Sequence, residues 1–183
     1  AIVQWLRDGL GFIEGSSEIE ALACEVDDSQ GVVVVPALTG LGAPHWRPEA
    51  RGLISGLTRG TTRAHIARAA LEGIALQVFD LLDAMRQDSG QAIASLKVDG
   101  GASANSLLMQ VQADLLELPI HRPNILDTTA LGAAYLAALG VGLFTNVDDI
   151  QKNWSLDKTY CPQENRLYAQ KLVKQWQKSV GKA

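Results

Sequence analysis

Short apolar runs separated by turn-forming residues predict alternating strands and helices along the chain. Val32 to Val35 are four apolar residues in a row, as expected for a strand buried on both faces in a largely parallel or mixed sheet. Further strands are predicted over residues 51–57, 93–98 and 118–123. The last is expected at a sheet edge, because its prolines cannot donate to a ladder. The pattern indicates a layered α/β domain with helices on both faces of the sheet.

The longest predicted helix begins at Thr61 or Thr62 and runs to about Gln87. It is apolar on nearly every face, which is typical of a helix buried inside a larger structure. Arg68 and Glu72 are four residues apart on this helix, with the base before the acid. That order is the weaker one for a surface pair, so we interpret the two as structural.

Other helices are expected over residues 1–8, 18–26 (capped by Ser16 or Ser17), 106–116, 130–139, 147–154 and 163–180. The helix at 130–139 is rich in Gly and Ala, which predicts close packing against another backbone. The helix at 163–180 carries Leu167, Leu172, Trp176 and Val180 on one stripe, with three lysines mostly off it. Such a helix can lie on a membrane surface, but docking against the domain is favoured.

A glycine pair, Gly100-Gly101, stands between a predicted strand and a predicted helix. Glycines let the backbone turn through positive φ and let a ligand approach closely. The helix start behind them is expected to offer unpaired N–H groups and the positive end of a dipole. One hypothesis is that this loop binds a nucleotide phosphate or ribose, and the other is that it is a plain strand-to-helix turn. Both stay open, because the loop is neither a Walker loop nor a G-x-G-x-x-G motif.

The Gly- and Pro-rich residues 36–51 predict a loop. One hypothesis is that His45 and Trp46 in this loop belong to a functional site. Anchoring of the loop to the core by Trp46 is the favoured interpretation.

Composition narrows the function classes. The chain has 183 residues, 47% hydrophobic and 20% charged, as in a globular domain of ordinary size. A net charge of −4 gives no reason to expect nucleic acid as a partner. No apolar run approaches the roughly 18 residues that span a bilayer, so no membrane association is expected. Cys24 and Cys161 are far apart and favour a cytoplasmic location. The chain does not begin with Met, and we expect it to be a piece of a longer protein.

Several spaced segments together resemble the FGGY family of carbohydrate kinases. They are Gly52 to Leu57, then His65-Ile66 after seven residues, and Ala69 to Glu72 after two more. Val98 to Asn105 and Thr129 to Ala137 are similar to two later blocks of that family. The segments occur in the family's order, and the resemblance covers essentially the whole chain.

Within the family, Thr39 to Pro44 is similar to the branch that phosphorylates glycerol. His45 stands where that branch has Tyr, and Arg47 stands where it has Asp. Both departures bear on contacts of the loop rather than on the class of activity.

The resemblance implies an actin-like ATPase fold, related to ribonuclease H, with a mixed sheet and helices on both faces. Residues 1–183 would form the C-terminal domain, incomplete at its N-terminal side, and the N-terminal domain would be absent. The full-length protein would be a homo-oligomer, either a dimer or a tetramer.

By match of position, Gln4, Gly101 and Asn105 would line an adenosine pocket, with Gly100 and Ala102 at its edge. The resemblance implies ATP and Mg²⁺, with glycerol as the acceptor. The catalytic base, the phosphate-binding turns and the polyol-binding residues would precede Ala1, so we assign no catalytic residue and no metal ligand to this chain. The chain alone is expected to bind ATP weakly at best and to be inactive. The alternatives are a kinase of the same family acting on xylulose or gluconate, and a non-catalytic nucleotide-binding module.

Overall fold

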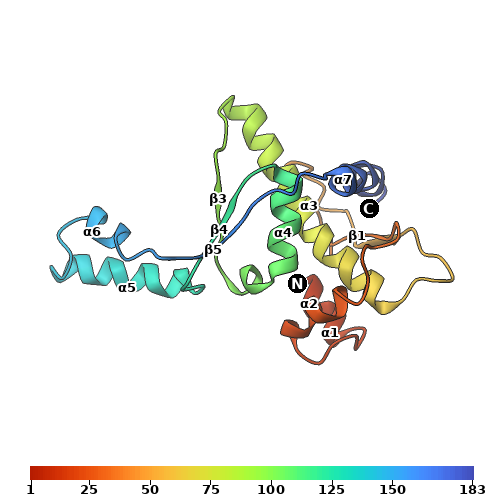
Figure 1. Ribbon diagram of the computed structural model, residues 1–183, viewed down its shortest axis with the longest axis horizontal. Helices are drawn as coiled ribbons and strands as arrows, with labels where there is room; N and C mark the ends of the chain where they lie inside the picture. The colour runs from red at the N-terminus through yellow and green to blue at the C-terminus, as the bar shows by residue number, and fades with distance from the viewer.

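Two small β-sheets and the helices around them form the structure, a computed structural model that describes residues 1–183 (Figure 1). Strands β1 (Val33–Val35) and β2 (Leu53–Ser55) form an antiparallel pair. Strand β4 (Ile120–Pro123) lies between β3 (Leu96–Lys97) and β5 (Leu156–Tyr160), parallel to β3 and antiparallel to β5. The second sheet is therefore mixed, as expected.

The helices are α1 (Ile2–Asp8), η1 (Ser16–Glu18), α2 (Ile19–Ala23), α3 (Arg63–Ser89), η2 (Gly101–Ala104), α4 (Ser106–Leu116), α5 (Thr128–Gly140), α6 (Val147–Gln151) and α7 (Leu167–Val180). Strand β5 was not predicted from the sequence. The predicted cap of the second helix is also wrong, because the residue before η1 is Gly15 and neither Ser16 nor Ser17 makes a side-chain cap.

The predicted edge position of β4 is wrong, since β4 is the central strand of its sheet. Pro119 precedes β4, and Pro123 is its last residue, at an irregularity of the ladder with β5. Both prolines therefore fall where no ladder N–H is needed.

Helix α3 runs through the middle of the molecule, as its apolar sequence predicts (Figure 1). It begins at Thr62, whose backbone N–H donates to Nδ1 of His65, and it ends at Gly90 with φ +63°. The helix crosses β1 at Gly73, where an added Cβ would lie 2.3 Å from the carbonyl oxygen of Val34. Only glycine allows this approach.

Both faces of β1 are buried, which confirms that prediction. Val33 and Val35 belong to an apolar cluster that includes residues of α4 and α7. Val32 and Val34 belong to a second cluster, formed with α1, α2 and the first half of α3. The burial results from helices on both sides of a short antiparallel pair, not from a wide parallel sheet.

Helix α7 packs against the domain, as favoured for this amphipathic helix. Leu172, Trp176 and Val180 are buried, while Leu167 in the first turn is exposed. Trp176 Nε1 donates to Asp80 Oδ2 at 2.6 Å. Among the helices described, none combines the length with the apolar character that a bilayer-spanning helix needs.

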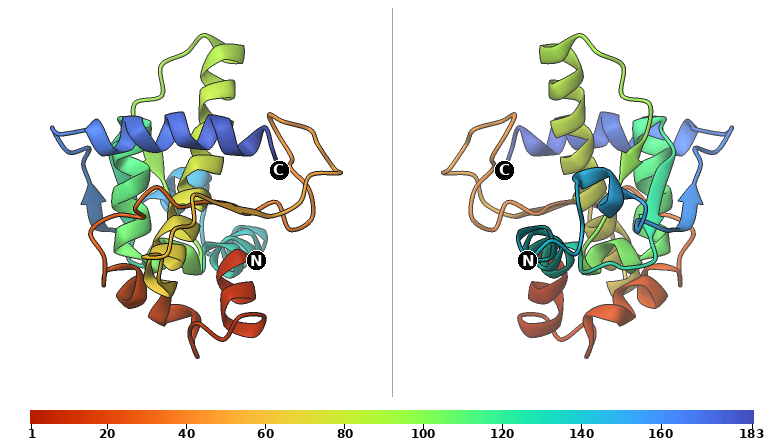
Figure 2. Two further views of the ribbon diagram at one scale, coloured as in Figure 1. Left: turned by 90° about the vertical axis from the view of Figure 1, so that its right-hand side faces the viewer. Right: turned by 90° about the vertical axis from the view of Figure 1, so that its left-hand side faces the viewer.

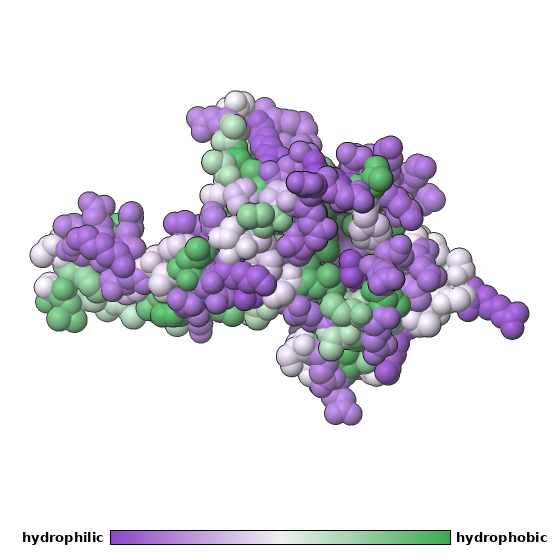
Figure 3. Space-filling model, viewed as in Figure 1, coloured by the Kyte–Doolittle hydropathy of each residue, from purple (hydrophilic) through white to green (hydrophobic).

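Helices α5 and α6 form an arm that projects away from the rest of the molecule (Figure 1). In Figure 2 the molecule is viewed along this arm, and α5 is seen end-on. No residue of α5 is buried, and a Cβ added to Gly132 would meet no atom within 4 Å. The predicted close packing of α5 is therefore not found: Asp127 caps the helix locally, and the residues of α5 are at most half-buried. Apolar residues are visible along the arm (Figure 3).

Candidate nucleotide-binding site

The loop between β3 and α4 places the glycine pair directly before a helix start. Gly100 has φ +78°, a backbone conformation that favours glycine. Gly101 begins η2, and Asn105 follows η2 as the N-cap of α4. A Cβ on Gly101 would meet no atom within 4 Å. The fold therefore requires glycine at position 100 but leaves open space at position 101.

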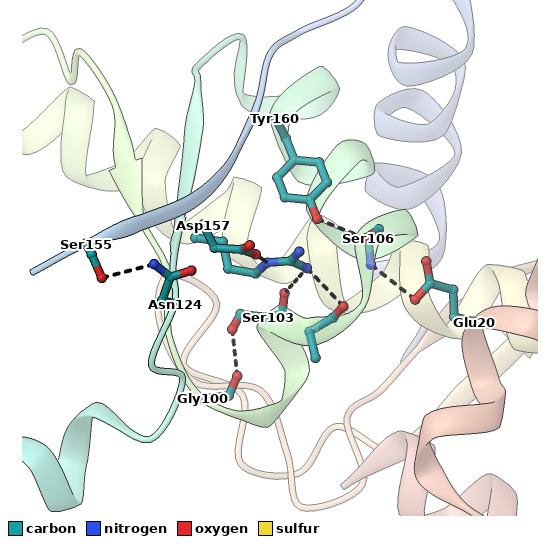
Figure 4. Close-up of polar contacts among 10 residues, drawn as sticks. Glu20, Gly100, Ser103, Ser106, Asn124, Ser155, Asp157 and Tyr160 are labelled. Atoms are coloured by element: carbon teal, nitrogen blue, oxygen red, sulfur yellow. Dashed lines mark hydrogen bonds and ion pairs between the residues drawn. The ribbon is translucent and has the colours of Figure 1, made fainter.

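Neighbouring segments hold this loop in place (Figure 4). The N–H of Gly100 donates to the carbonyl oxygen of Leu126 at 2.8 Å. The Ser103 hydroxyl donates to the carbonyl oxygen of Gly100 at 2.7 Å. The Thr128 hydroxyl donates to the carboxylate of Asp99, which ties the loop to the start of α5. These contacts fix the backbone of the loop around Gly100.

Arg122 on β4 supports the other end of the loop. Its Nη1 donates to the carbonyl oxygens of Ser103 at 3.3 Å and Ala104 at 3.1 Å. Its Nε donates to Asp157 Oδ2 at 2.7 Å, and its guanidinium lies 5.4 Å from the ring centre of Tyr160. Arg122 was not identified as a site residue from the sequence. A charged residue inside a predicted strand was a signal, but its partners Asp157 and Tyr160 lie on β5, which was not predicted.

The start of α4 does not offer the unpaired N–H groups that the sequence suggested. The N–H groups of Ser106 and Leu107 donate to the Glu20 carboxylate at 3.2 and 3.1 Å. The next N–H, of Leu108, donates to Asn105 Oδ1 at 2.8 Å. A carboxylate already complements the positive end of this helix and would repel a phosphate there. The expectation of unpaired N–H groups at the start of α4 is therefore wrong.

Three hydrogen-bond donors of the loop remain free. No hydrogen bond within the chain uses the backbone N–H groups of Gly101 and Ala102, and both residues are exposed. The side-chain NH₂ group of Asn105 is also unused, because only its Oδ1 caps α4. The loop can thus present backbone and amide donors to a ligand that lies against Gly101.

The structure brings four of the five candidate residues together on one loop, namely Gly100, Gly101, Ala102 and Asn105. Gln4 lies apart from them in sequence, on an exposed position of α1. No hydrogen bond joins Gln4 to the loop, so its role in a nucleotide site stays a prediction.

His45 and Trp46 behave differently from the favoured interpretation. The Trp46 side chain is 75% exposed and does not anchor its loop to the core. Two other residues anchor the loop: His45 Nε2 lies 2.7 Å from Asp80 Oδ2 on α3, and the Arg47 guanidinium donates to the carbonyl oxygens of Val180 and Ala183 at 3.1 and 2.9 Å. Trp46 has φ +49° and is exposed, while His45 reaches a half-buried carboxylate.

The Arg68–Glu72 pair is structural, as interpreted. Arg68 Nε donates to Glu72 Oε1 at 2.8 Å, and the hydroxyl of Tyr168 on α7 donates to the same oxygen at 2.7 Å. Burial raises the pKa of Glu72, and it also raises the pKa of Tyr168. These contacts join α3 to α7 and lie outside the glycine loop.

Comparison with known proteins identifies the family to which the chain belongs. Residues 1–141 match the FGGY family of carbohydrate kinases, C-terminal domain. The chain belongs to this family. It is 56% identical over all 183 residues to the glycerol kinase of Deinococcus radiodurans, of which it covers 36%. It therefore spans little more than a third of the length of this curated relative.

Solved FGGY kinases share the fold. The crystal structure of Plasmodium falciparum glycerol kinase with ADP superposes with a TM-score of 0.85 at 34% identity, over 98% of this chain and 36% of that chain. The gluconate kinase from Lactobacillus acidophilus gives a TM-score of 0.79 at 25% identity, over 97% of this chain and 36% of that chain. The FGGY fold is an actin-like ATPase fold, and these residues form part of one of its domains.

Proposed function

We propose that this chain forms the adenosine-binding part of an ATP-dependent kinase. The kinase would transfer the γ-phosphoryl group of ATP to a terminal hydroxyl of glycerol and give glycerol 3-phosphate. The observation that carries the proposal is the braced loop with free donors at Gly101, Ala102 and Asn105, in a chain 56% identical to a glycerol kinase. The identity to the gluconate kinase is lower, at 25%, which favours glycerol over gluconate as the acceptor.

In this proposal the loop acts by position and not by chemistry. The absence of a side chain at Gly101 lets the nucleoside lie against the backbone. The NH₂ group of Asn105 donates to the nucleoside while its oxygen keeps α4 capped. Gln4 would contribute a donor and an acceptor from α1. Because Arg122 and Asp99 already hold the loop, little of the binding free energy is lost in ordering it.

Phosphoryl transfer also requires a base for the attacking hydroxyl and neutralisation of the phosphate charge, which Mg²⁺ supplies in kinases. No group of three or more His, Cys, Asp and Glu side chains in the structure is placed to hold a metal ion. We assign neither the base nor a metal ligand to residues of this chain. The proposal is that the chain alone binds ATP weakly and does not phosphorylate glycerol.

A chimera tests the proposal. The corresponding C-terminal third of the Deinococcus radiodurans glycerol kinase is replaced by this chain, and phosphorylation of glycerol, xylulose and gluconate is measured. Active transfer to glycerol is expected, with an Asn105→Ala variant raising KM for ATP about tenfold and leaving KM for glycerol unchanged. Glu25→Gln, an exposed change with no side-chain hydrogen bond, serves as the control.

Two other functions give different results. A non-catalytic nucleotide-binding module predicts a folded chimera that binds ADP and transfers no phosphoryl group. If the protein is instead a kinase for another sugar, the full-length protein that contains these residues should prefer xylulose or gluconate over glycerol. A cytoplasmic location and a dimeric or tetrameric state of that enzyme stay predictions.

A further inference from the structure

Glu20 on α2 reaches the first turn of α4, 86 residues further along the chain. Its Oε2 accepts from the N–H of Ser106 at 3.2 Å (Figure 4). Its Oε1 accepts from the N–H of Leu107 at 3.1 Å. One carboxylate thus satisfies two consecutive backbone donors of another helix. Hydrogen bonds to a charged acceptor are stronger than neutral ones, and a negative charge at a helix start complements its dipole.

The residue before this turn is Asn105, a proposed nucleotide contact. Its side-chain oxygen is committed to Leu108, so its NH₂ group can point only where the cap geometry directs it. The two residues that follow it are held by Glu20, and the Ser106 hydroxyl also lies 2.9 Å from the hydroxyl of Tyr160. The direction of the Asn105 amide is therefore set jointly from α2 and β5.

Glu20 is half-buried and makes no other side-chain hydrogen bond. Sequence periodicity gives no reason for it, because a Glu in a short helix reads as a solvent-facing residue. Glu20 lies on α2, which follows the helix that carries Gln4, and it bonds the helix that follows Asn105. It fixes α4, and with it the loop, relative to the N-terminal helices.

We propose that Glu20 is a positioning residue of the nucleotide site. It holds the start of α4 so that Asn105 and the free N–H groups of Gly101 and Ala102 face the same nucleoside. Its charge also occupies the helix start, so the nucleotide meets the loop with its adenosine end and its phosphates lie elsewhere. This inference rests on the proposed function, and it adds a residue that does not itself touch the nucleotide.

The test uses the chimera in which this chain replaces the corresponding part of the Deinococcus radiodurans glycerol kinase, with ADP as the probe. Glu20→Gln, Glu20→Asp and Glu20→Ala are compared with the control Glu25→Gln, which removes the same charge from a nearby exposed turn. ¹⁵N NMR follows the amide signals of residues 100–108 and their hydrogen exchange, first without a nucleotide and then during a titration with ADP. Thermal unfolding is measured in parallel.

For Glu20→Ala we expect ADP affinity to fall about tenfold, with faster amide exchange at Ser106 and Leu107 and shifted signals over residues 100–105. Asp and Gln each retain part of the acceptor pattern and should rescue part of the affinity, whereas Glu25→Gln should match the wild type. A purely structural Glu20 would lower the unfolding temperature but leave ADP affinity unchanged well below it, which would overturn the proposal.

The proposed function can fail separately. If the wild-type chimera shows no ADP-dependent shift at residues 100–105, the nucleotide site is refuted, and the positioning role falls with it. If the wild-type chimera binds ADP at these residues and Glu20→Ala binds it equally tightly, only the positioning role of Glu20 is refuted.

Discussion

Gly100 and Gly101 are neighbours, yet the fold needs only the first to be glycine. Gly100 adopts φ +78°, while Gly101 has ordinary backbone geometry and no atom within 4 Å of an added Cβ. Nothing inside the chain explains the second glycine. The nucleotide proposed above would explain it, because a methyl group there would stand between the nucleotide and the free N–H groups.

Alanine substitutions separate the two roles. Gly101→Ala should change the free energy of unfolding by less than about 0.5 kcal/mol while weakening ADP binding. Gly100→Ala should cost roughly 1–3 kcal/mol of stability, because alanine is strained at this φ. Urea unfolding and ADP titration measure the two effects. Wild-type ADP affinity in Gly101→Ala would contradict the proposed site.

The family resemblance proposed candidate site residues on one loop, namely Gly100, Gly101, Ala102 and Asn105, together with Gln4 on α1. It could not identify Arg122 and Glu20, which reach the loop from other elements through backbone carbonyl and N–H groups. Backbone partners leave no mark in the sequence, so only tertiary structure assigns such residues.

At the scale of elements, α3 organises the packing. It crosses β1 at Gly73, bonds α7 through Glu72 and Asp80, and separates the two apolar clusters. Its length and burial were predicted from its apolar sequence. The contact of Gly73 with β1 was not predicted, because glycine is unfavourable within a helix and only the packing against β1 explains its presence.

Gly73→Ala should destabilise the fold by about 1–3 kcal/mol, because the methyl group would overlap the backbone of Val34. Gly132→Ala on α5 is the matched control, since it has open space and should keep or raise stability by roughly 0.5–1 kcal/mol. Chemical denaturation with circular dichroism distinguishes them. Equal stability of the two variants would show that α3 does not approach β1 so closely.

Glu72→Gln should remove a pH dependence of stability. Burial raises the pKa of Glu72 in the folded state, so the folded chain keeps this proton more tightly than the unfolded chain. The stability linked to that proton is complete below the unfolded pKa and is lost as pH rises through the raised pKa. Across this window the variant should therefore gain stability relative to the wild type. Urea unfolding at several pH values between 4 and 9 measures the difference, and a pH-independent difference would contradict the burial effect.

At the scale of the whole molecule, the arm is the feature that this chain leaves uncovered. Leu136, Val141 and Leu143 are 71%, 75% and 78% exposed. Helix α5 has no buried residue. The chain corresponds to 36% of a glycerol kinase relative, so most of such a protein is available to cover this face. Apolar surface of this kind promotes association when it stays in water.

The isolated chain should therefore self-associate as its concentration rises. A double variant, Leu136→Gln with Leu143→Gln, should shift the equilibrium toward the monomer in analytical ultracentrifugation. Leu167→Gln is the control, because this leucine is also exposed but lies on α7, outside the arm. A wild-type chain that stays monomeric at high concentration would refute the prediction.

The sequence by itself determined the buried strand at Val32 to Val35, the long central helix and the glycine loop, because these depend on residues close together in the chain. It also determined the family, because several spaced segments occur in the family's order. Tertiary structure decided the central place of β4, the existence of β5, the exposure of Trp46 and the satisfied start of α4. Each of these depends on which distant backbone group a residue meets. Local periodicity carries no information about such pairings, since hydrogen bonds to the backbone can form with any residue type.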